Sequence, residues 1–161
     1  MGPHVVTLSP LNEGGLVADD VVAMVVEASF DPEIPSMNDL PRGLDAARAR
    51  QFCTGREGVI LRLDGEPVGA AIAQLDPWPG DGVELPAGCV ELDEWVLAPF
   101  RGLGLLGKRG AWPLIAAWLA GLADHALAVT WTHNYAAQSL VRSRGYRHLG
   151  STYWTGPVSA G

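Results

Sequence analysis

Charged residues are scarce in this chain of 161 residues, at 18%, whereas 48% of its residues are hydrophobic. A disordered chain would need the opposite balance. No apolar run reaches the roughly 18 residues of a membrane span, because Pro113 and Gly121 interrupt the longest candidate, residues 111–123. The start of the chain also lacks the basic stretch and apolar core of a signal peptide. We therefore expect one domain over residues 1–161, with no membrane partner and a cytoplasmic location.

Cysteine and basic residues are also in short supply. Only Cys53 and Cys89 are present, and two distant thiols with four unclustered histidines predict neither a disulfide framework nor a metal site. Lysine and arginine number 11 against 18 aspartates and glutamates, which gives a net charge of −7. Nucleic acid is not an expected partner, because binding its phosphates requires a basic surface. An acidic surface would instead attract a cation such as an amine.

Apolar periodicity predicts a series of strands and helices. Strands are predicted at residues 4–8, 59–63, 68–75, 89–97, 127–131 and 146–154, and helices at residues 15–30, 40–52, from the glycine-rich stretch to about 124, and 136–143. Hairpins join the strands of the first half. A helix joins strand 89–97 to strand 127–131, which makes these two parallel. The predicted fold class is α/β, with a mixed sheet flanked by helices.

The most informative stretch follows strand 89–97. A predicted strand and a predicted helix flank the sequence Leu97-Ala98-Pro99-Phe100-Arg101-Gly102-Leu103-Gly104-Leu105-Leu106-Gly107. Glycines before a helix let backbone N–H groups approach a phosphate, and the helix N-terminus adds partial positive charge. Residues 101–107 therefore predict a site for a phosphorylated ligand.

Three phosphate-binding motifs compete for these residues. They are the dinucleotide pattern Gly102-x-Gly104-x-x-Gly107, an incomplete P-loop ending in Gly107-Lys108, and Arg101-x-x-Gly104 of acyl-CoA-dependent acetyltransferases. The P-loop would need Ser or Thr where Arg109 stands. The dinucleotide site would need an acidic residue about 20 residues on, at the end of the next strand. A glycine turn without any ligand also stays open.

The second half of the chain resembles the GNAT superfamily of acyl-CoA N-acetyltransferases. The matching motifs, in order, are Leu97-x-Pro99-x-Arg101-Gly102-x-Gly104, Asn134-x-x-Ala137-x-x-Leu140 and Gly145-Tyr146. The resemblance covers the cofactor-binding half, about residues 89–154. In the residues that precede this half, only the order of strands and helices matches. It implies a central twisted mixed sheet that splays at strand 89–97. It also implies transfer of an acetyl group from acetyl-CoA to a primary amine of a small molecule or peptide, through a tetrahedral intermediate.

The resemblance assigns residues to the cofactor. Pantetheine would pair with the backbone around residues 95–97, where an amide near Leu97 could hold the developing oxyanion. Backbone amides of residues 101–106 would hold the diphosphate, and Asn134 would lie near the pantetheine arm or polarise the site. The expected cofactor residues are Trp95, Val96, Leu97, Arg101, Gly102, Leu103, Gly104, Leu105, Leu106 and Asn134.

The acceptor side offers several carboxylates. An attacking alkylamine must lose a proton, so a base or a chain of water molecules is needed. Glu94 is the candidate catalytic base, and Glu91, Asp93 and Trp78 are candidate substrate-binding residues. Strand alternation places Glu91 and Asp93 on one face and Glu94 on the other. Loop 30–38 is a further expected acceptor-side segment.

Two departures from the family pattern matter. Many members carry a Tyr that protonates the leaving thiolate, but Val141 stands there, so Tyr135, Ser139 and His133 are candidate substitutes. The missing Tyr leaves open an alternative, a non-catalytic CoA-binding or regulatory domain.

The second departure lies after the glycines, where Leu106 occupies a position that is usually Gly or Ala. Gly110 and Pro113 then disfavour a continuous helix. Either the turn is longer, with Pro113 in the first helical turn, or the helix is kinked.

An exposed edge strand leaves a homodimer possible.

Overall fold

The computed structural model describes residues 4–77, 84–130, 134–150 and 153–158. Trp78 and His133 lie outside these ranges, so the roles expected of them stay predictions. The elements are β1 (Val6–Pro10), α1 (Asp19–Ser29), α2 (Ile34–Met37), α3 (Ala46–Thr54), β2 (Glu57–Leu63), β3 (Glu66–Gln74), β4 (Cys89–Val96), the 3-10 turn η1 (Ala98–Phe100), α4 (Trp112–Ala120), β5 (His125–Val129), α5 (Tyr135–Ser143), β6 (Arg147–Gly150) and β7 (Tyr153–Pro157).

A seven-stranded mixed sheet organises the molecule, in the order β1-β2-β3-β4-β5-β7-β6. Strands β1 to β4 pair antiparallel with their neighbours. Strand β5 pairs parallel with β4, as the helical connection predicts, and β7 pairs antiparallel with both β5 and β6. The predicted fold class, a mixed sheet flanked by helices, is confirmed.

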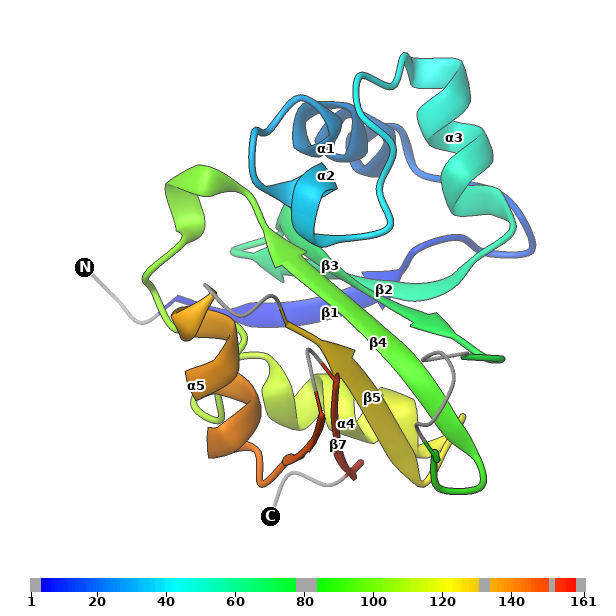
Figure 1. The fold of residues 1–161 in the computed structure, drawn as a ribbon. Coiled ribbons are helices and arrows are strands. Elements are labelled where there is room, and N and C mark those ends of the chain that lie inside the picture. Colours follow the sequence, from blue (N-terminus) through cyan, green and yellow to red (C-terminus); the bar gives the residue numbers. More distant parts are fainter. Residues whose placement is uncertain (1–3, 78–83, 131–133, 151–152, 159–161) are drawn as a thin grey trace.

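Helices cover both faces of the sheet. Figure 1 shows α1, α2 and α3 over one face and α4 and α5 over the other. Alternation along β4 explains the two layers, since Val90 and Leu92 join the cluster of α4, whereas Trp95 and Leu97 join that of α1 and α3. None of the described helices has the length and apolarity to cross a membrane.

Several predicted elements differ from the observed ones, among them strand 146–154, helix 40–52 and strand 127–131. The single strand expected at 146–154 is two strands, β6 and β7, which pair antiparallel with each other. The helix expected from residue 40 begins only at Ala46, where the Asp45 side chain accepts a hydrogen bond from Arg48 N at 2.8 Å. Gly43 precedes it with a φ of +67°, which an α-helix does not allow. Strand β5 starts at His125, two residues earlier than expected.

The glycine-rich connection after β4 is long, and the helix after it is not kinked. Helix α4 begins at Trp112 with Pro113 in its first turn, where the missing proline N–H costs no hydrogen bond. The turn closes through Ala111 N donating to Leu105 O at 2.6 Å. A Cβ at Gly110 would lie 2.4 Å from Leu105 O, so only glycine fits there. Of the two predicted alternatives, the longer turn is therefore correct.

Both thiols are buried and unpaired, as expected of structural cysteines. Burial raises the pKa of the Cys53 thiol to about 11 and also raises the pKa of Cys89. A raised thiol pKa lowers the share of reactive thiolate, which favours structural roles for both cysteines.

Candidate functional site

Strands β4 and β5 separate along their length. Their ladder covers only the pairs from Cys89↔His125 to Glu91↔Leu127. On the other edge, β4 stays paired with β3 up to Val96↔Gly69. The carboxyl half of β4 thus has a neighbouring strand on one side only, within the described part of the chain, which is the splay that the resemblance implies.

The pairing with β3 determines which backbone groups face this splay. Leu97 N donates to Val68 O at 2.8 Å, so the Leu97 amide is not available to an oxyanion. Backbone groups of successive strand residues point to opposite edges. Trp95 therefore also turns its backbone to β3, and the N–H and C=O of Val96 and Glu94 point toward the splay. The side chains of Trp95 and Leu97 are buried in the α1–α3 layer.

The glycine turn, residues 101–107, presents a set of unpaired donors. Arg101 N donates to Ala98 O at 3.2 Å, and Gly107 N donates to Gly104 O at 3.1 Å. Within the described residues, the backbone N–H groups of residues 102–106 meet no acceptor. Gly102 and Gly104 have φ angles of +80° and +70°, a backbone conformation that glycine adopts readily and other residues rarely do. Consecutive free N–H groups in such a turn form an anion-binding nest.

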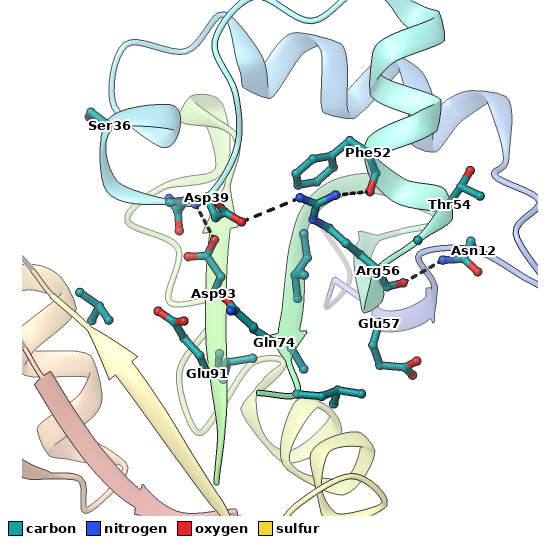
Figure 2. A pocket seen from close by; sticks show the side chains of 17 residues that line it. Asn12, Ser36, Asp39, Phe52, Thr54, Arg56, Glu57, Gln74, Glu91 and Asp93 are labelled. Atoms are coloured by element: carbon teal, nitrogen blue, oxygen red, sulfur yellow. Dashed lines mark hydrogen bonds and ion pairs between the residues drawn. The ribbon is translucent and has the colours of Figure 1, made fainter. Parts of the chain in front are cut away.

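A cavity of about 750 Å³ opens on the α1–α3 face beside β4. Figure 2 shows side chains pointing into it from the segment after α2, the end of α3, and strands β2, β3 and β4. We call it the acidic cavity, because four carboxylates face one guanidinium among its charged residues, Asp39, Arg56, Glu57, Glu91 and Asp93. Its remaining walls come from Asn12, Ser36, Asn38, Phe52, Thr54, Gly55, Ile72, Ala73, Gln74, Leu75, Leu92 and Val129.

Asp93 is the carboxylate whose charge is most affected by this setting. Its pKa is raised to about 7, mainly by burial and to a lesser degree by the charges of Glu91, Asp39 and Glu94, whereas the hydrogen bond that favours its ionised form lowers it. That bond comes from Asp39 N to Asp93 Oδ2, at 2.9 Å. Burial, followed by the charge of Asp39, also raises the pKa of Glu91. Asp93 can therefore gain or lose a proton near neutral pH, which a general base requires.

Glu94 points to the opposite face, as strand alternation predicts. Its two carboxylate oxygens accept from Arg144 Nη1 and Nη2 at 2.5 and 2.9 Å. The Arg144 side chain is fully buried, lies 3.9 Å from the Trp112 ring centre, and donates to Leu106 O at 2.8 Å. This bidentate pair favours a structural role for Glu94 over the predicted role as base.

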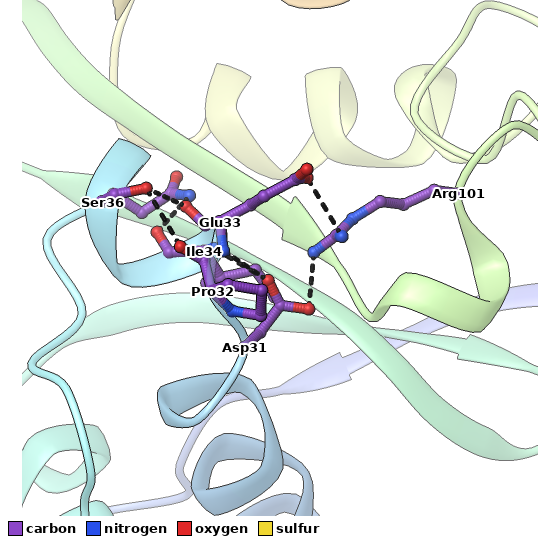
Figure 3. Close-up of polar contacts among 7 residues, drawn as sticks. Asp31, Pro32, Glu33, Ile34, Ser36 and Arg101 are labelled. Carbon is purple, nitrogen blue, oxygen red and sulfur yellow. Dashed lines mark hydrogen bonds and ion pairs between the residues drawn. The ribbon is translucent and has the colours of Figure 1, made fainter.

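Arg101 also directs its side chain away from the glycine turn. Its guanidinium lies 2.9 Å from Asp31 Oδ2 and 3.1 Å from Glu33 Oε2, in the connection between α1 and α2 (Figure 3). In this orientation the Arg101 side chain does not reach toward the glycine turn, so only the backbone of Arg101 could contact a phosphate bound there. In the same turn, Leu103 is exposed and Leu105 is buried.

Helix α5 carries the remaining predicted residues. Asn134 caps it, because its side-chain oxygen accepts from Ala137 N at 3.1 Å. Tyr135 is 75% exposed and Ser139 is also exposed. Val141, at the position of the missing Tyr, is buried in the α4 cluster. These placements leave the roles expected of Asn134, Tyr135 and Ser139 as predictions.

The sequence interpretation named Glu91 and Asp93 of the acidic cavity but not its other charged residues, Asp39, Arg56 and Glu57. Asp39 lies 54 residues before Asp93, to whose carboxylate its backbone amide donates a hydrogen bond. Arg56 stacks 3.9 Å from the Phe52 ring centre and comes within 3.9 Å of Asp39 Oδ2. Neither Asp39 nor Arg56 belongs to a local motif; only the expectation that loop 30–38 faces the acceptor pointed to this region.

No protein-family model matches the chain, and no curated protein matches its sequence. Solved structures do match its fold. The aminoglycoside acetyltransferase AAC(6')-Ib in complex with coenzyme A and kanamycin superimposes with a TM-score of 0.69 at 19% identity, over 95% of each chain. The GNAT domain of S. lividans PAT gives a TM-score of 0.68 at 16% identity, over 93% of this chain and 89% of that domain. The structure of yncA from Salmonella typhimurium with its cofactor acetyl-CoA gives 0.63 at 16% identity, over 96% and 94%.

At these identities the likeness concerns the fold. The chain has the fold of the GNAT acetyltransferases, with a sheet that splays between β4 and β5 and a glycine turn after β4.

Proposed function

We propose that this protein transfers an acetyl group from acetyl-CoA to a primary amine of a small, positively charged acceptor. One observation supports this proposal most strongly. A turn with free backbone N–H groups, a strand edge without a neighbouring strand and an acidic cavity all adjoin β4 within the described part of the chain. The reaction needs a holder for a diphosphate, a place for a thioester and a place for an amine, and we assign these three roles to the three features in that order.

The cofactor would be held mainly by backbone. The free N–H groups of residues 102–106 would bind the diphosphate, because consecutive amides in a nest suit a doubly charged anion. Pantetheine would occupy the splay and pair with the backbone of Val96 and Glu94. The Val96 amide, rather than that of Leu97, would then be the donor for the oxyanion.

The acceptor would enter the acidic cavity, where Asp93 is the proposed base. Its pKa of about 7 leaves about half of it ionised at neutral pH, ready to take a proton from the ammonium. The amine nitrogen then forms a bond to the acetyl carbon, the C–S bond of the thioester breaks, and the second proton that the nitrogen must lose passes to the departing thiolate. The thiolate leaves without a positioned Tyr, since a thiol of pKa near 8.5 is a tolerable leaving group.

Charge argues for the class of acceptor. The charged residues that line the cavity are four carboxylates, Asp39, Glu57, Glu91 and Asp93, and one guanidinium, that of Arg56. A cavity with this balance would bind a compound that carries several amines better than a neutral or anionic one. The neighbour AAC(6')-Ib was solved with kanamycin, a polyamine of this kind, so aminoglycosides are the first acceptors to test.

The test measures release of free thiol from acetyl-CoA with kanamycin, spermidine and benzylamine as acceptors. We expect turnover with a polyamine above that with benzylamine. We also expect kcat to rise with pH through an inflection near pH 7, which Asp93→Asn abolishes while lowering the rate about 10²–10⁴-fold. Glu91→Gln, on the same face of β4, is the matched control, and it should raise KM but keep the inflection.

A second candidate function is a CoA-binding regulatory domain. Buried Val141, in place of an acid Tyr, is the observation that favours it. Binding of acetyl-CoA without thiol release for any amine of the panel would establish this candidate and refute the transferase.

A further inference from the structure

Arg101 belongs to the glycine turn, but its guanidinium contacts a segment on the acceptor side. Nη2 lies 2.9 Å from Asp31 Oδ2, and Nη1 lies 3.1 Å from Glu33 Oε2. Figure 3 shows the side chain of Arg101 reaching across to these two carboxylates. Asp31 is only 9% exposed, so its charge depends on this partner more than a surface carboxylate would.

Asp31 uses both of its oxygens. Oδ1 accepts from Glu33 N at 2.8 Å and from Ile34 N at 3.1 Å, at the start of α2, while Oδ2 faces Arg101. Burial opposes ionisation of Asp31, but the bonds from Glu33 N and Arg101 outweigh it and lower its pKa. The guanidinium of Arg101 and the backbone amides of Glu33 and Ile34 therefore hold the Asp31 carboxylate from two sides.

The segment continues from Asp31 into the wall of the acidic cavity. Within it, Ser36 Oγ donates to Glu33 O at 2.8 Å, and Asn38 Nδ2 donates to Ile34 O at 3.0 Å. At its end, the Asp39 amide donates to the carboxylate of Asp93, the proposed base. Segment 31–39 is thus held at one end by the glycine turn and at the other by β4, with internal bonds between.

The negative charge of segment 31–39 requires a basic partner, and Arg101 supplies it. Segment 31–39 contains Asp31, Glu33 and Asp39 and no basic residue. Without the guanidinium, two of these carboxylates would face each other near the turn that is to receive a diphosphate. Like charges at such distances repel, and the segment would move away from the turn.

We propose that Arg101 is a positioning residue for the acceptor wall and not a ligand of the cofactor's phosphates. Its guanidinium holds segment 31–39, and through that segment Asp39 and Asp93, in place beside the splay. The diphosphate is left to the backbone amides of the same turn. This inference rests on the proposed function for its ligands, but the arginine's contact with segment 31–39 can be tested without them.

The experiment compares Arg101→Ala with the wild-type protein in three measurements. Hydrogen exchange of the amides in segment 31–39, without ligand, should become about tenfold faster or more, while α3 stays unchanged. The Kd for CoA from calorimetry should change by less than about threefold. If kanamycin is an acceptor, its KM should rise about tenfold or more, while the KM for acetyl-CoA stays within about threefold.

Three further variants protect the test against a folding defect. Asp31→Asn keeps an oxygen for the amides of α2 but removes the more buried of the two ion pairs of Arg101, and it should reproduce part of the faster exchange. Arg101→Lys keeps the charge but not the two-pronged shape, and it should restore exchange only in part. Arg50→Ala removes another arginine–aspartate pair, with Asp19 at 2.8 Å, and should leave exchange in segment 31–39 and CoA affinity unchanged.

Opposite results would overturn the inference. A guanidinium that binds the diphosphate contributes a charge-assisted bond, so its loss would weaken CoA binding by about tenfold or more. That loss with unchanged exchange in segment 31–39 would assign Arg101 to the cofactor. If the wild-type protein binds no CoA, the proposed function fails instead, and the exchange measurement alone then decides whether Arg101 holds the segment.

Discussion

Among single residues, Asp93 has the setting that departs most from that of a surface carboxylate. Its raised pKa follows mainly from burial, and the Asp39 amide is its one hydrogen-bond donor among the residues that the structure describes. The nearby Glu94 has two strong bonds to Arg144 and points to the other face. The absence of a cationic partner in the described part of the chain leaves Asp93 able to exchange a proton, whereas the ion pair with Arg144 gives Glu94 a structural role.

The free energy of unfolding should report the Asp93 titration directly. Its native pKa of about 7 lies above the usual 3.8, so the folded state keeps a proton that the unfolded chain loses. The stabilisation from that proton is complete below about pH 4 and is lost as the pH rises through 7. Asp93→Asn should therefore gain stability relative to wild type between pH 5 and pH 8, by on the order of 1–3 kcal/mol.

Urea unfolding at the two pH values measures this difference. Glu57→Gln, at an exposed position on the rim of the same cavity, is the control for removing one charge. An equal effect of Asp93→Asn at pH 5 and pH 8 would show that the Asp93 carboxyl has an ordinary pKa.

At the scale of elements, Arg144 joins three parts of the proposed cofactor site. Located just after α5, it binds Glu94 of β4 and the carbonyl of Leu106 in the glycine turn, and it stacks on Trp112 of α4. Its burial makes the pair with Glu94 sensitive to loss of either partner, because an unpaired buried charge is left behind.

Glu94→Gln should therefore lower the free energy of unfolding by about 3 kcal/mol or more and also weaken CoA binding, because the turn loses a fixed anchor. Urea unfolding and calorimetry measure the two effects. Asp20→Asn breaks the more exposed pair between Asp20 and Arg62 and should cost less than about 1 kcal/mol. Similar losses in the two variants would contradict the structural role of the Glu94–Arg144 pair.

The elements also mark how far the sequence can be interpreted. Strands β2, β3 and β4 follow from local alternation and a hairpin turn, and the glycine turn follows from its composition. The ion pairs could not be predicted, because Glu94 and Arg144 lie 50 residues apart and meet only through packing of α5 against the sheet. The same holds for the contact of Asp39 with Asp93, which depends on how segment 31–39 folds over β4.

For the whole molecule, the arrangement of the sheet explains why the site lies where it does. The first four strands form a continuous antiparallel sheet, whereas β5 leaves β4 after Glu91. Helices α1 to α3 place the acidic cavity on one face, and the glycine turn leads to α4 on the other (Figure 1). A cofactor that lies in the splay would therefore reach the turn with one end and the cavity with the other.

Calorimetric titration with CoA and, in parallel, with pantetheine tests the central claim that the amides of residues 102–106 hold a diphosphate. The two compounds share the arm that would lie in the splay, but only CoA carries the diphosphate. We predict that CoA binds and that pantetheine binds about tenfold more weakly or worse, because it lacks the charge-assisted bonds. No heat with CoA, or equal affinities for both compounds, would contradict the claim.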